Sequence, residues 1–220
     1  MRLIDVYDWT HMRILRVCSL VALLVSQVAV GTTREWHFNV WADGWPIGTH
    51  TFRVVDEEGH RTVETVANFR PKILFVEVYR YDHRDRESWQ DGCLQEIDAH
   101  TDDNGKVVNL QGAANQDGFR LESPHPGSVL EGCVHTFAYW DKRFLQQTHL
   151  LDSQTGEYTD VTITDLGKQN INIRGQAVEA EHYTVSARKF TTDLWYSSAS
   201  EWLALESLTW NGHRLRYERQ

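Results

Sequence analysis

Apolar and polar residues alternate with a period of two along most of this chain, and turn sequences interrupt the alternation repeatedly. Residues 36–41 (WHFNVW) and 49–55 (THTFRVV) show the pattern, and Asp43-Gly44 stands between them. Successive side chains of a strand point to opposite faces of its sheet, and Asp-Gly is a typical hairpin turn. The pattern therefore predicts a fold built mainly of antiparallel β-hairpins.

The same signals continue to the C-terminus. Glu58-Gly59 and Asp102 to Gly105 indicate further turns, and Asn211-Gly212 joins two alternating segments near the end of the chain. We expect about eleven strands in a single antiparallel domain, with no internal repeat or linker. One segment differs: Phe137, Trp140 and Phe144 recur at helical spacing, so residues 136–148 are predicted to form one short helix.

The N-terminal residues have the composition of an export signal. Arg13 and Arg16 precede the apolar run Val17 to Val30, and Ala29-Val30-Gly31 has the small residues of a cleavage site. The run is shorter than the roughly 20 residues of a membrane-spanning helix. We therefore expect residues 1–31 to be an extension followed by a secretory signal, with residues 32–220 as the exported domain. An uncleaved N-terminal anchor is the alternative.

Charge and cysteine content limit the partners and the compartment. Residues 1–31 contain three arginines and two aspartates, so the net charge of −9 for the whole chain becomes −10 for residues 32–220. Such an acidic protein is poorly suited to bind nucleic acid. The exported part keeps two cysteines, Cys93 and Cys133, which are predicted to form a disulfide in an oxidising compartment. We expect a periplasmic or secreted protein that does not span the membrane after cleavage.

Three segments together resemble a family of exported bacterial proteins that is defined only as a domain of unknown function. They are VWADGWPIGTHTF at residues 40–52, the tyrosine-rich strand that runs into WQDGCL, and DLWYSSASEWLALE at residues 193–206. The wider group is similar in architecture to periplasmic lipoprotein carriers. The resemblance implies a curled antiparallel half-barrel that wraps a helix and encloses an apolar cavity. It implies no reaction and no catalytic residue.

The most chemically varied stretch is YRYDHRDRESWQDGCL, Tyr79 to Leu94. If residues 73–89 form one extended strand, their side chains alternate between two faces. The even-numbered face becomes wholly polar after Val78, as expected for a surface in contact with solvent. The odd-numbered face is expected to line the concave wall of the sheet, and its candidate ligand-binding residues are Tyr79, Tyr81, His83, Glu87 and Trp89.

Two interpretations of this strand remain open. His83 could act as a general acid or base, oriented by Asp85 or Glu87, in a hydrolase or lyase that acts on a glycan. Alternatively, the strand is an ordinary charge-paired one in which arginines bridge acids on neighbouring strands. The ten histidines of the exported part show no HxH or HxxxH spacing, and no phosphate-binding glycine loop is present. We therefore expect neither a metal nor a cofactor.

The predicted helix completes the first functional hypothesis. Phe137, Trp140 and Phe144 would form the floor of a cavity that accepts an apolar or amphipathic molecule or lipid of the cell envelope. A filled core would produce the same pattern of large apolar residues. An envelope scaffold or assembly factor without a small ligand is the second hypothesis, and an exposed apolar patch would favour it. Whether the protein catalyses any reaction is left open, with binding preferred.

Overall fold

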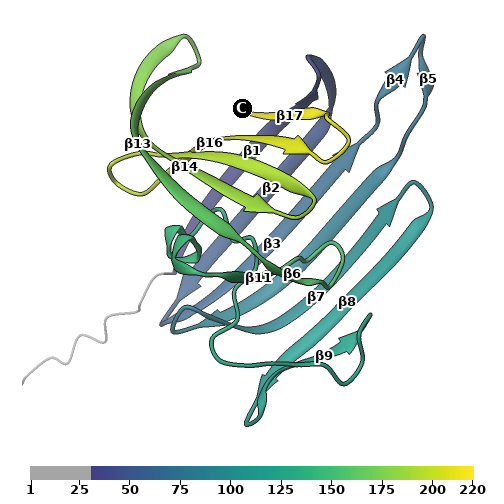
Figure 1. Ribbon diagram of the computed structural model, residues 1–220, viewed down its shortest axis with the longest axis vertical. Coiled ribbons are helices and arrows are strands. Elements are labelled where there is room, and N and C mark those ends of the chain that lie inside the picture. The colour runs from purple at the N-terminus through teal and green to yellow at the C-terminus, as the bar shows by residue number, and fades with distance from the viewer. Residues whose placement is uncertain (1–30) are drawn as a thin grey trace, which may run out of the picture.

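The computed structural model describes residues 31–220, in which thirteen strands form one antiparallel sheet (Figure 1). The spatial order of the strands is β10-β9-β8-β7-β6-β3-β2-β1-β17-β16-β15-β14-β13. Their bounds are β1 Thr32–Ala42, β2 Trp45–Glu57, β3 His60–Phe69, β6 Tyr81–Gln90, β7 Cys93–Asp103, β8 Lys106–Asn115, β9 Gly118–Ser123, β10 Val129–Leu130, β13 Thr162–Ile173, β14 Gln176–Ala187, β15 Phe190–Tyr196, β16 Trp202–Thr209 and β17 Arg214–Arg219. The first and last strands of the domain, β1 and β17, pair with each other in the middle of the sheet.

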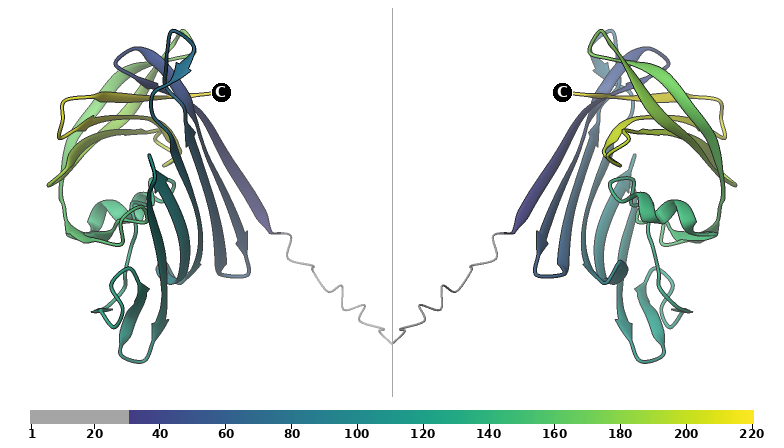
Figure 2. Two further views of the ribbon diagram at one scale, coloured as in Figure 1. Left: turned by 90° about the vertical axis from the view of Figure 1, so that its right-hand side faces the viewer. Right: turned by 90° about the vertical axis from the view of Figure 1, so that its left-hand side faces the viewer.

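The sheet curls into a half-barrel, and the chain between its two edges crosses the concave side (Figure 2). We call residues 131–148 the strap; they include a single 3-10 turn, η1 (Lys142–Gln146). A two-stranded ribbon of β11 (His149–Leu151) and β12 (Tyr158–Asp160) follows the strap. A second ribbon, β4 (Lys72–Ile73) with β5 (Val76–Glu77), lies between β3 and β6 in the sequence. The predicted all-β half-barrel is confirmed, although the strands outnumber the eleven expected.

Aromatic residues from the two halves of the sheet meet in the core. Trp202 on β16 is fully buried, and its ring centroid lies 4.7 Å from that of Phe38 on β1 and 5.0 Å from that of Phe52 on β2. Tyr139 of the strap approaches the same indole at 5.7 Å. Alternate side chains of β1, β2 and β16 thus pack against the strap, which fills the concave side.

The prediction of one extended strand over residues 73–89 is wrong. The chain forms the β4–β5 ribbon first, and β6 begins only at Tyr81. Leu74 and Phe75 adopt left-handed backbone conformations, with φ of 47° and 70°, which reverse the chain between β4 and β5. Large apolar residues give no sequence signal for such a turn, because left-handed positions normally contain Gly, Asn or Asp.

The helix predicted over residues 136–148 is also wrong, since only η1 is helical. Backbone carbonyls of this segment bond to distant residues instead: the hydroxyl of Tyr196 donates to the carbonyl of Tyr139 at 2.8 Å, and the amide of Val161 donates to the carbonyl of Thr148. Asp141 then caps the short 3-10 turn by accepting from the amide of Arg143 at 3.0 Å. Tertiary hydrogen bonds therefore override a helical spacing of apolar residues.

The predicted extension and signal sequence lie almost wholly in residues 1–30, outside the described part of the chain. Within residues 31–220, no helix is long and apolar enough to cross a membrane.

Candidate functional site

The inner face of β6 contains the residues expected from its alternation. Tyr81, His83, Glu87 and Trp89 are buried, whereas the intervening Arg84 and its even-numbered neighbours are half-buried or exposed. The register with β7 shifts between Ser88 and Trp89, at the end of the strand, and does not turn Trp89 away from the core. The structure therefore brings four of the five candidate wall residues of this stretch to the concave side.

Tyr79 is the exception, and its assignment to the inner wall is wrong. It precedes β6, is 36% exposed, and its hydroxyl donates to the carboxylate of Asp103. The β4–β5 ribbon breaks the alternation on which the assignment rested, because residues 78–80 belong to no strand.

Cross-strand register arranges the buried residues of β6 in lateral rows on the concave face. The row at His83 holds two histidines and a threonine, the row at Asp85 holds one acid and a threonine, and the row at Glu87 is otherwise apolar. From β2 through β3 and β6 to β7, the rows are His50, Ala67, His83 and Thr101; Phe52, Thr65, Asp85 and Ala99; and Val54, Val63, Glu87 and Ile97. Polar groups from four strands thus form one cluster, which we call the inner-wall cluster.

His83 is the centre of this cluster. Its Nδ1 lies 2.9 Å from the hydroxyl of Thr101, and its Nε2 lies 3.4 Å from Oδ2 of Asp85. The hydroxyl of Ser153 approaches Nε2 at 3.5 Å from the loop between β11 and β12. The side chain of His83 is only 2% exposed and that of Asp85 only 5%. The imidazole is therefore held on both nitrogens and enclosed by protein.

Glu87 is the second acid of the cluster and lies deeper in the core. Burial, together with the neighbouring carboxylate of Asp85, raises the pKa of Glu87 well above its usual value. The indole of Trp89 donates to its Oε2 at 2.9 Å. A neutral carboxyl can occupy this apolar row at a much smaller desolvation cost than a carboxylate.

The raised pKa of Glu87 predicts a specific dependence of stability on pH. The folded protein holds this proton after the unfolded chain loses it, so the stabilisation is complete below the ordinary pKa of 4.5 and is lost as the pH rises toward the folded pKa. Glu87→Gln removes the titration. Between the ordinary pKa of 4.5 and the folded pKa, we expect wild type to lose stability relative to the variant by up to about 1.4 kcal/mol per pH unit. Urea unfolding between pH 5 and 9 measures this difference.

The control for this comparison is Glu96→Gln, because Glu96 is an exposed acid on the neighbouring strand β7. Its stability should follow that of wild type at every pH. Parallel profiles for wild type and Glu87→Gln would contradict the buried neutral carboxyl.

His50 closes the cluster on the β2 side. Burial, with a contribution from His83, lowers the pKa of His50 to about 3, so the ring is neutral at pH 7. It stacks on Phe52 at 4.2 Å, and its Nδ1 lies 3.3 Å from the hydroxyl of Tyr217. The Nε2 of His50 and the Oδ1 of Asp85 are buried without a hydrogen-bond partner. Both residues line a cavity of about 50 Å³, which has room for water molecules but not for an organic ligand.

Of the three aromatic residues expected to form a cavity floor, Phe137 and Trp140 line the cavity of about 50 Å³, and all three also pack in or against the core. Phe144 and Trp140 are 0% and 3% exposed, and the ring of Trp140 meets that of Trp89 edge-on at 5.5 Å. Phe137 is half-buried against Phe190 of β15, with 5.3 Å between ring centroids. The strap thus fills the volume that an apolar ligand would need beneath it.

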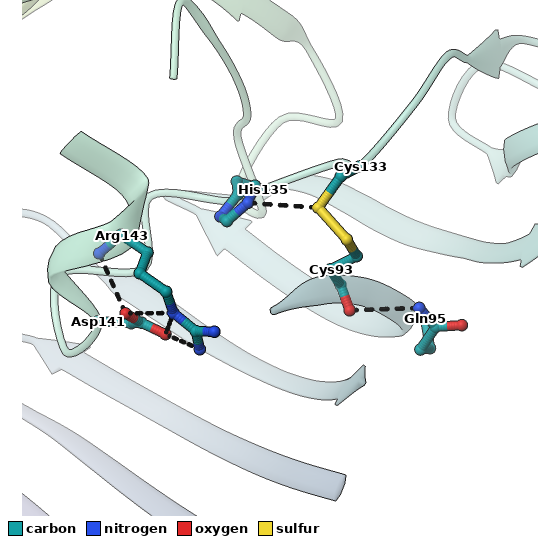
Figure 3. The surroundings of a disulfide bond; sticks show 6 residues. All are labelled: Cys93, Gln95, Cys133, His135, Asp141 and Arg143. Atoms are coloured by element: carbon teal, nitrogen blue, oxygen red, sulfur yellow. Dashed lines mark hydrogen bonds and ion pairs between the residues drawn. A yellow bond between two sulfur atoms is a disulfide. The ribbon is translucent and has the colours of Figure 1, made fainter. Parts of the chain in front are cut away.

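The disulfide predicted between Cys93 and Cys133 is confirmed and fixes the strap to the sheet (Figure 3). It joins the first residue of β7 to the beginning of the strap across 40 residues of sequence. Further along the strap, Asp141 accepts from Arg143 at 2.9 Å (Figure 3). It also accepts from Arg61 of β3 at 2.8 Å. A covalent bond near the beginning of the strap and an ion pair from Arg61 to its middle therefore hold it to the sheet.

A larger pocket opens beside the inner-wall cluster, at residues that the sequence did not single out. Its volume is about 490 Å³, within the range of small-molecule sites. Apolar groups and charged or polar groups both contribute to its wall, which comes from β9, β10, β12 and the turn between β14 and β15. The residues are Leu121, Leu130, Ala187 and Phe190 among the apolar ones, and His125, Ser128, Asp152, Glu157, Tyr158, Asp160, Arg188 and Lys189 among the others.

Two of the acids at this pocket, Asp152 and Glu157, have shifted pKa values. Lys189 pairs with Glu157 at 2.8 Å, and this hydrogen bond holds the pKa of the Glu157 carboxyl below its ordinary value. Burial raises the pKa of Asp152, which lines both the pocket and the 50 Å³ cavity. The segments that meet here are up to about 70 residues apart in the sequence, so no local pattern marks them as one site.

In the part of the chain from residue 31 onward, no group of three or more His, Cys, Asp or Glu side chains is placed to hold a metal ion.

Fold and site together define an open, antiparallel β-barrel-like protein with a strap across its concave side. The chain belongs to the DUF6134 family, a domain of unknown function whose model matches residues 38–220. Among solved structures, it is similar to a β-barrel-like protein of the DUF1849 family from Brucella abortus, with a TM-score of 0.63 and 9% sequence identity. That match covers 84% of this chain and 94% of the other, and at this identity it concerns the fold alone. A search of curated proteins finds no match.

Proposed function

We propose that this protein is an exported binding protein that accepts a small amphipathic molecule in the pocket of about 490 Å³. The single observation that carries the proposal is the contrast between the two hollows of the half-barrel. The space beneath the strap is about 50 Å³, whereas the pocket beside it is about ten times larger. A ligand of the envelope would therefore bind beside the strap and not beneath it.

The wall chemistry indicates the kind of ligand. Leu121, Leu130 and Phe190 offer an apolar surface, and charged groups of both signs lie at the same pocket, where Lys189 pairs with Glu157. Such a wall suits a molecule with an apolar body and a polar or charged head, because the body displaces water from apolar surface while the head meets charged side chains.

Export is supported by two independent features. The signal-like composition of residues 1–31 precedes the domain, and the domain contains a disulfide between Cys93 and Cys133. Disulfides persist mainly in oxidising compartments such as the bacterial periplasm. We therefore place the protein in the periplasm or outside the cell.

Catalysis by His83 with Glu87 has less geometric support. Glu87 bonds to the indole of Trp89, not to His83, and both side chains are enclosed in the core. A glycan would have to displace the strap to reach them.

The proposal is tested by blocking the pocket. We expect the amphipathic anion 1-anilinonaphthalene-8-sulfonate to bind wild type saturably, with one site per chain in a fluorescence titration. Ser128→Trp places an indole at the pocket wall, at an exposed residue, and should weaken binding by about tenfold or more. Ser198→Trp, in the exposed turn after β15, is the matched control and should bind as wild type does.

Native mass spectrometry of gently purified protein complements the titration. A co-purifying molecule that is present in wild type and Ser198→Trp but lost in Ser128→Trp would support the pocket. Equal dye binding by all three proteins would contradict it.

A further inference from the structure

The β4–β5 ribbon is the most exposed apolar feature of the molecule, and neither the pocket nor the inner-wall cluster uses it. Four consecutive residues at its tip, Ile73, Leu74, Phe75 and Val76, are 64%, 87%, 97% and 65% exposed. The ribbon projects from one end of the sheet as a narrow finger (Figure 1). We call residues 72–77 the finger.

The turn of the finger has a non-glycine residue at its second left-handed position, where five other hairpins of residues 31–220 have glycine. Five other hairpins reverse through two left-handed residues of which the second is always glycine: Asp43-Gly44, Glu58-Gly59, Asp91-Gly92, Asn104-Gly105 and Arg174-Gly175. The finger uses the same pair of conformations for Leu74 and Phe75. A bulky residue at positive φ is strained, and such strain is concentrated at functional positions.

The strain and the exposure of Leu74 and Phe75 together indicate that these residues contact something other than this chain. Asn-Gly would form this turn without strain and without apolar exposure. Leu74 and Phe75 instead lower stability and make almost no contact within the described domain, since they are 87% and 97% exposed. Their side chains are therefore suited to contact another phase or molecule.

We propose that the finger inserts Leu74 and Phe75 into the interfacial region of a lipid bilayer. A stable protein interface needs about 20–30 residues on each side, far more than the tip supplies. A bilayer requires no matching surface, and weak reversible binding follows from burying a few apolar side chains at the headgroup boundary.

Charges at the base of the finger agree with this partner. Residues 73–76 include no charged group, and the next cross-strand pair, Lys72 with Glu77, is of opposite sign. Arg70 forms ion pairs with Asp82 at 2.6 Å and with Glu77 at 3.7 Å. The charges at the base of the finger therefore oppose one another, although the whole chain is acidic, and do not repel a membrane surface there. We expect binding to phosphatidylcholine vesicles with only weak dependence on salt.

The test uses Leu74→Asn/Phe75→Gly, which restores a favourable turn while removing the two apolar side chains. The thermal unfolding midpoint should rise by about 2–4 °C, so any loss of binding cannot be ascribed to misfolding. Co-sedimentation with phosphatidylcholine vesicles should weaken by about tenfold or more. Leu166→Asn, which removes a 53% exposed leucine from β13, is the control and should bind as wild type does.

A local readout is needed because the apolar residues 17–30 of the full chain could bind vesicles themselves. Hydroxyl-radical footprinting with and without vesicles should show protection of Phe75 from oxidation and no protection of Leu166. The proposal would be overturned if vesicles did not protect Phe75 from oxidation. It would also be overturned if the double variant bound vesicles as wild type does, with the same pattern of protection outside the finger. Self-association of wild type that the double variant abolishes, seen by light scattering without vesicles, would also overturn it.

Discussion

Replacing Cys93 and Cys133 together by serine is expected to lower the free energy of unfolding by roughly 4 kcal/mol. The disulfide closes a segment of 40 residues and thereby restricts the unfolded chain. In the folded protein it fixes the beginning of the strap against β7, beside the hydrogen bond from the amide of Leu94 to the carbonyl of Val134. Urea unfolding of oxidised wild type and of the double variant measures the difference.

Reduced wild type is the matched control, since it has the native sequence without the covalent link. Its unfolding midpoint should agree with that of the double variant, and both should lie below that of oxidised wild type. If oxidised wild type and the variant unfolded at the same urea concentration, the link would not contribute to stability as we infer.

Phe144→Ala is expected to lower the free energy of unfolding by about 3–5 kcal/mol. Phe144 is fully buried, lies in η1, and contacts the ring of Tyr139 with 5.7 Å between centroids. Truncation removes apolar contact and leaves a cavity between the strap and the sheet. Chemical unfolding measures the loss, and near-ultraviolet circular dichroism reports the packing of the surrounding aromatic rings.

Gln146→Ala is the control for this substitution, because Gln146 is exposed in the same 3-10 turn. We expect it to change stability by no more than about 0.5 kcal/mol. A loss near that value for Phe144→Ala would mean that the strap does not pack as the structure describes.

Loss of the disulfide and Phe144→Ala both weaken the attachment of the strap, so their effects on the free energy of unfolding should not be independent. Once the disulfide is absent, the strap can release more easily, and Phe144→Ala should then cost less than it does in oxidised wild type. The triple variant measures this coupling, because residues that share one structural element give non-additive changes in stability.

The strap also explains why the cavity beneath it is small. A curled sheet alone would expose a wide apolar wall, including Trp89, Phe52 and Trp202. Trp140, Phe144 and Tyr139 cover that wall and leave only the polar cavity at His50 and Asp85. The binding function that we propose therefore rests on the neighbouring pocket, whose wall includes the turn between β14 and β15.

Local sequence determined the features that depend on neighbours in the chain. Alternation predicts the strands and the buried face of β6 from Tyr81 to Trp89, because side-chain direction in a strand repeats every two residues. Turn pairs such as Asp43-Gly44 predict hairpins for the same local reason. The disulfide was predictable because Cys93 and Cys133 are the two cysteines of residues 32–220.

Tertiary structure decided what depends on distant segments. The helix predicted over residues 136–148 does not form because carbonyls of this segment accept hydrogen bonds from Tyr196 of β15 and from Val161. Tyr79 does not reach the inner wall because Leu74 and Phe75 turn the chain without glycine. The pocket joins β9, β12 and the β14–β15 turn, and no pattern within one segment records that they meet. Hydrophobic spacing specifies that a residue is buried, but the packing of the whole sheet determines what it is buried against and how much space remains.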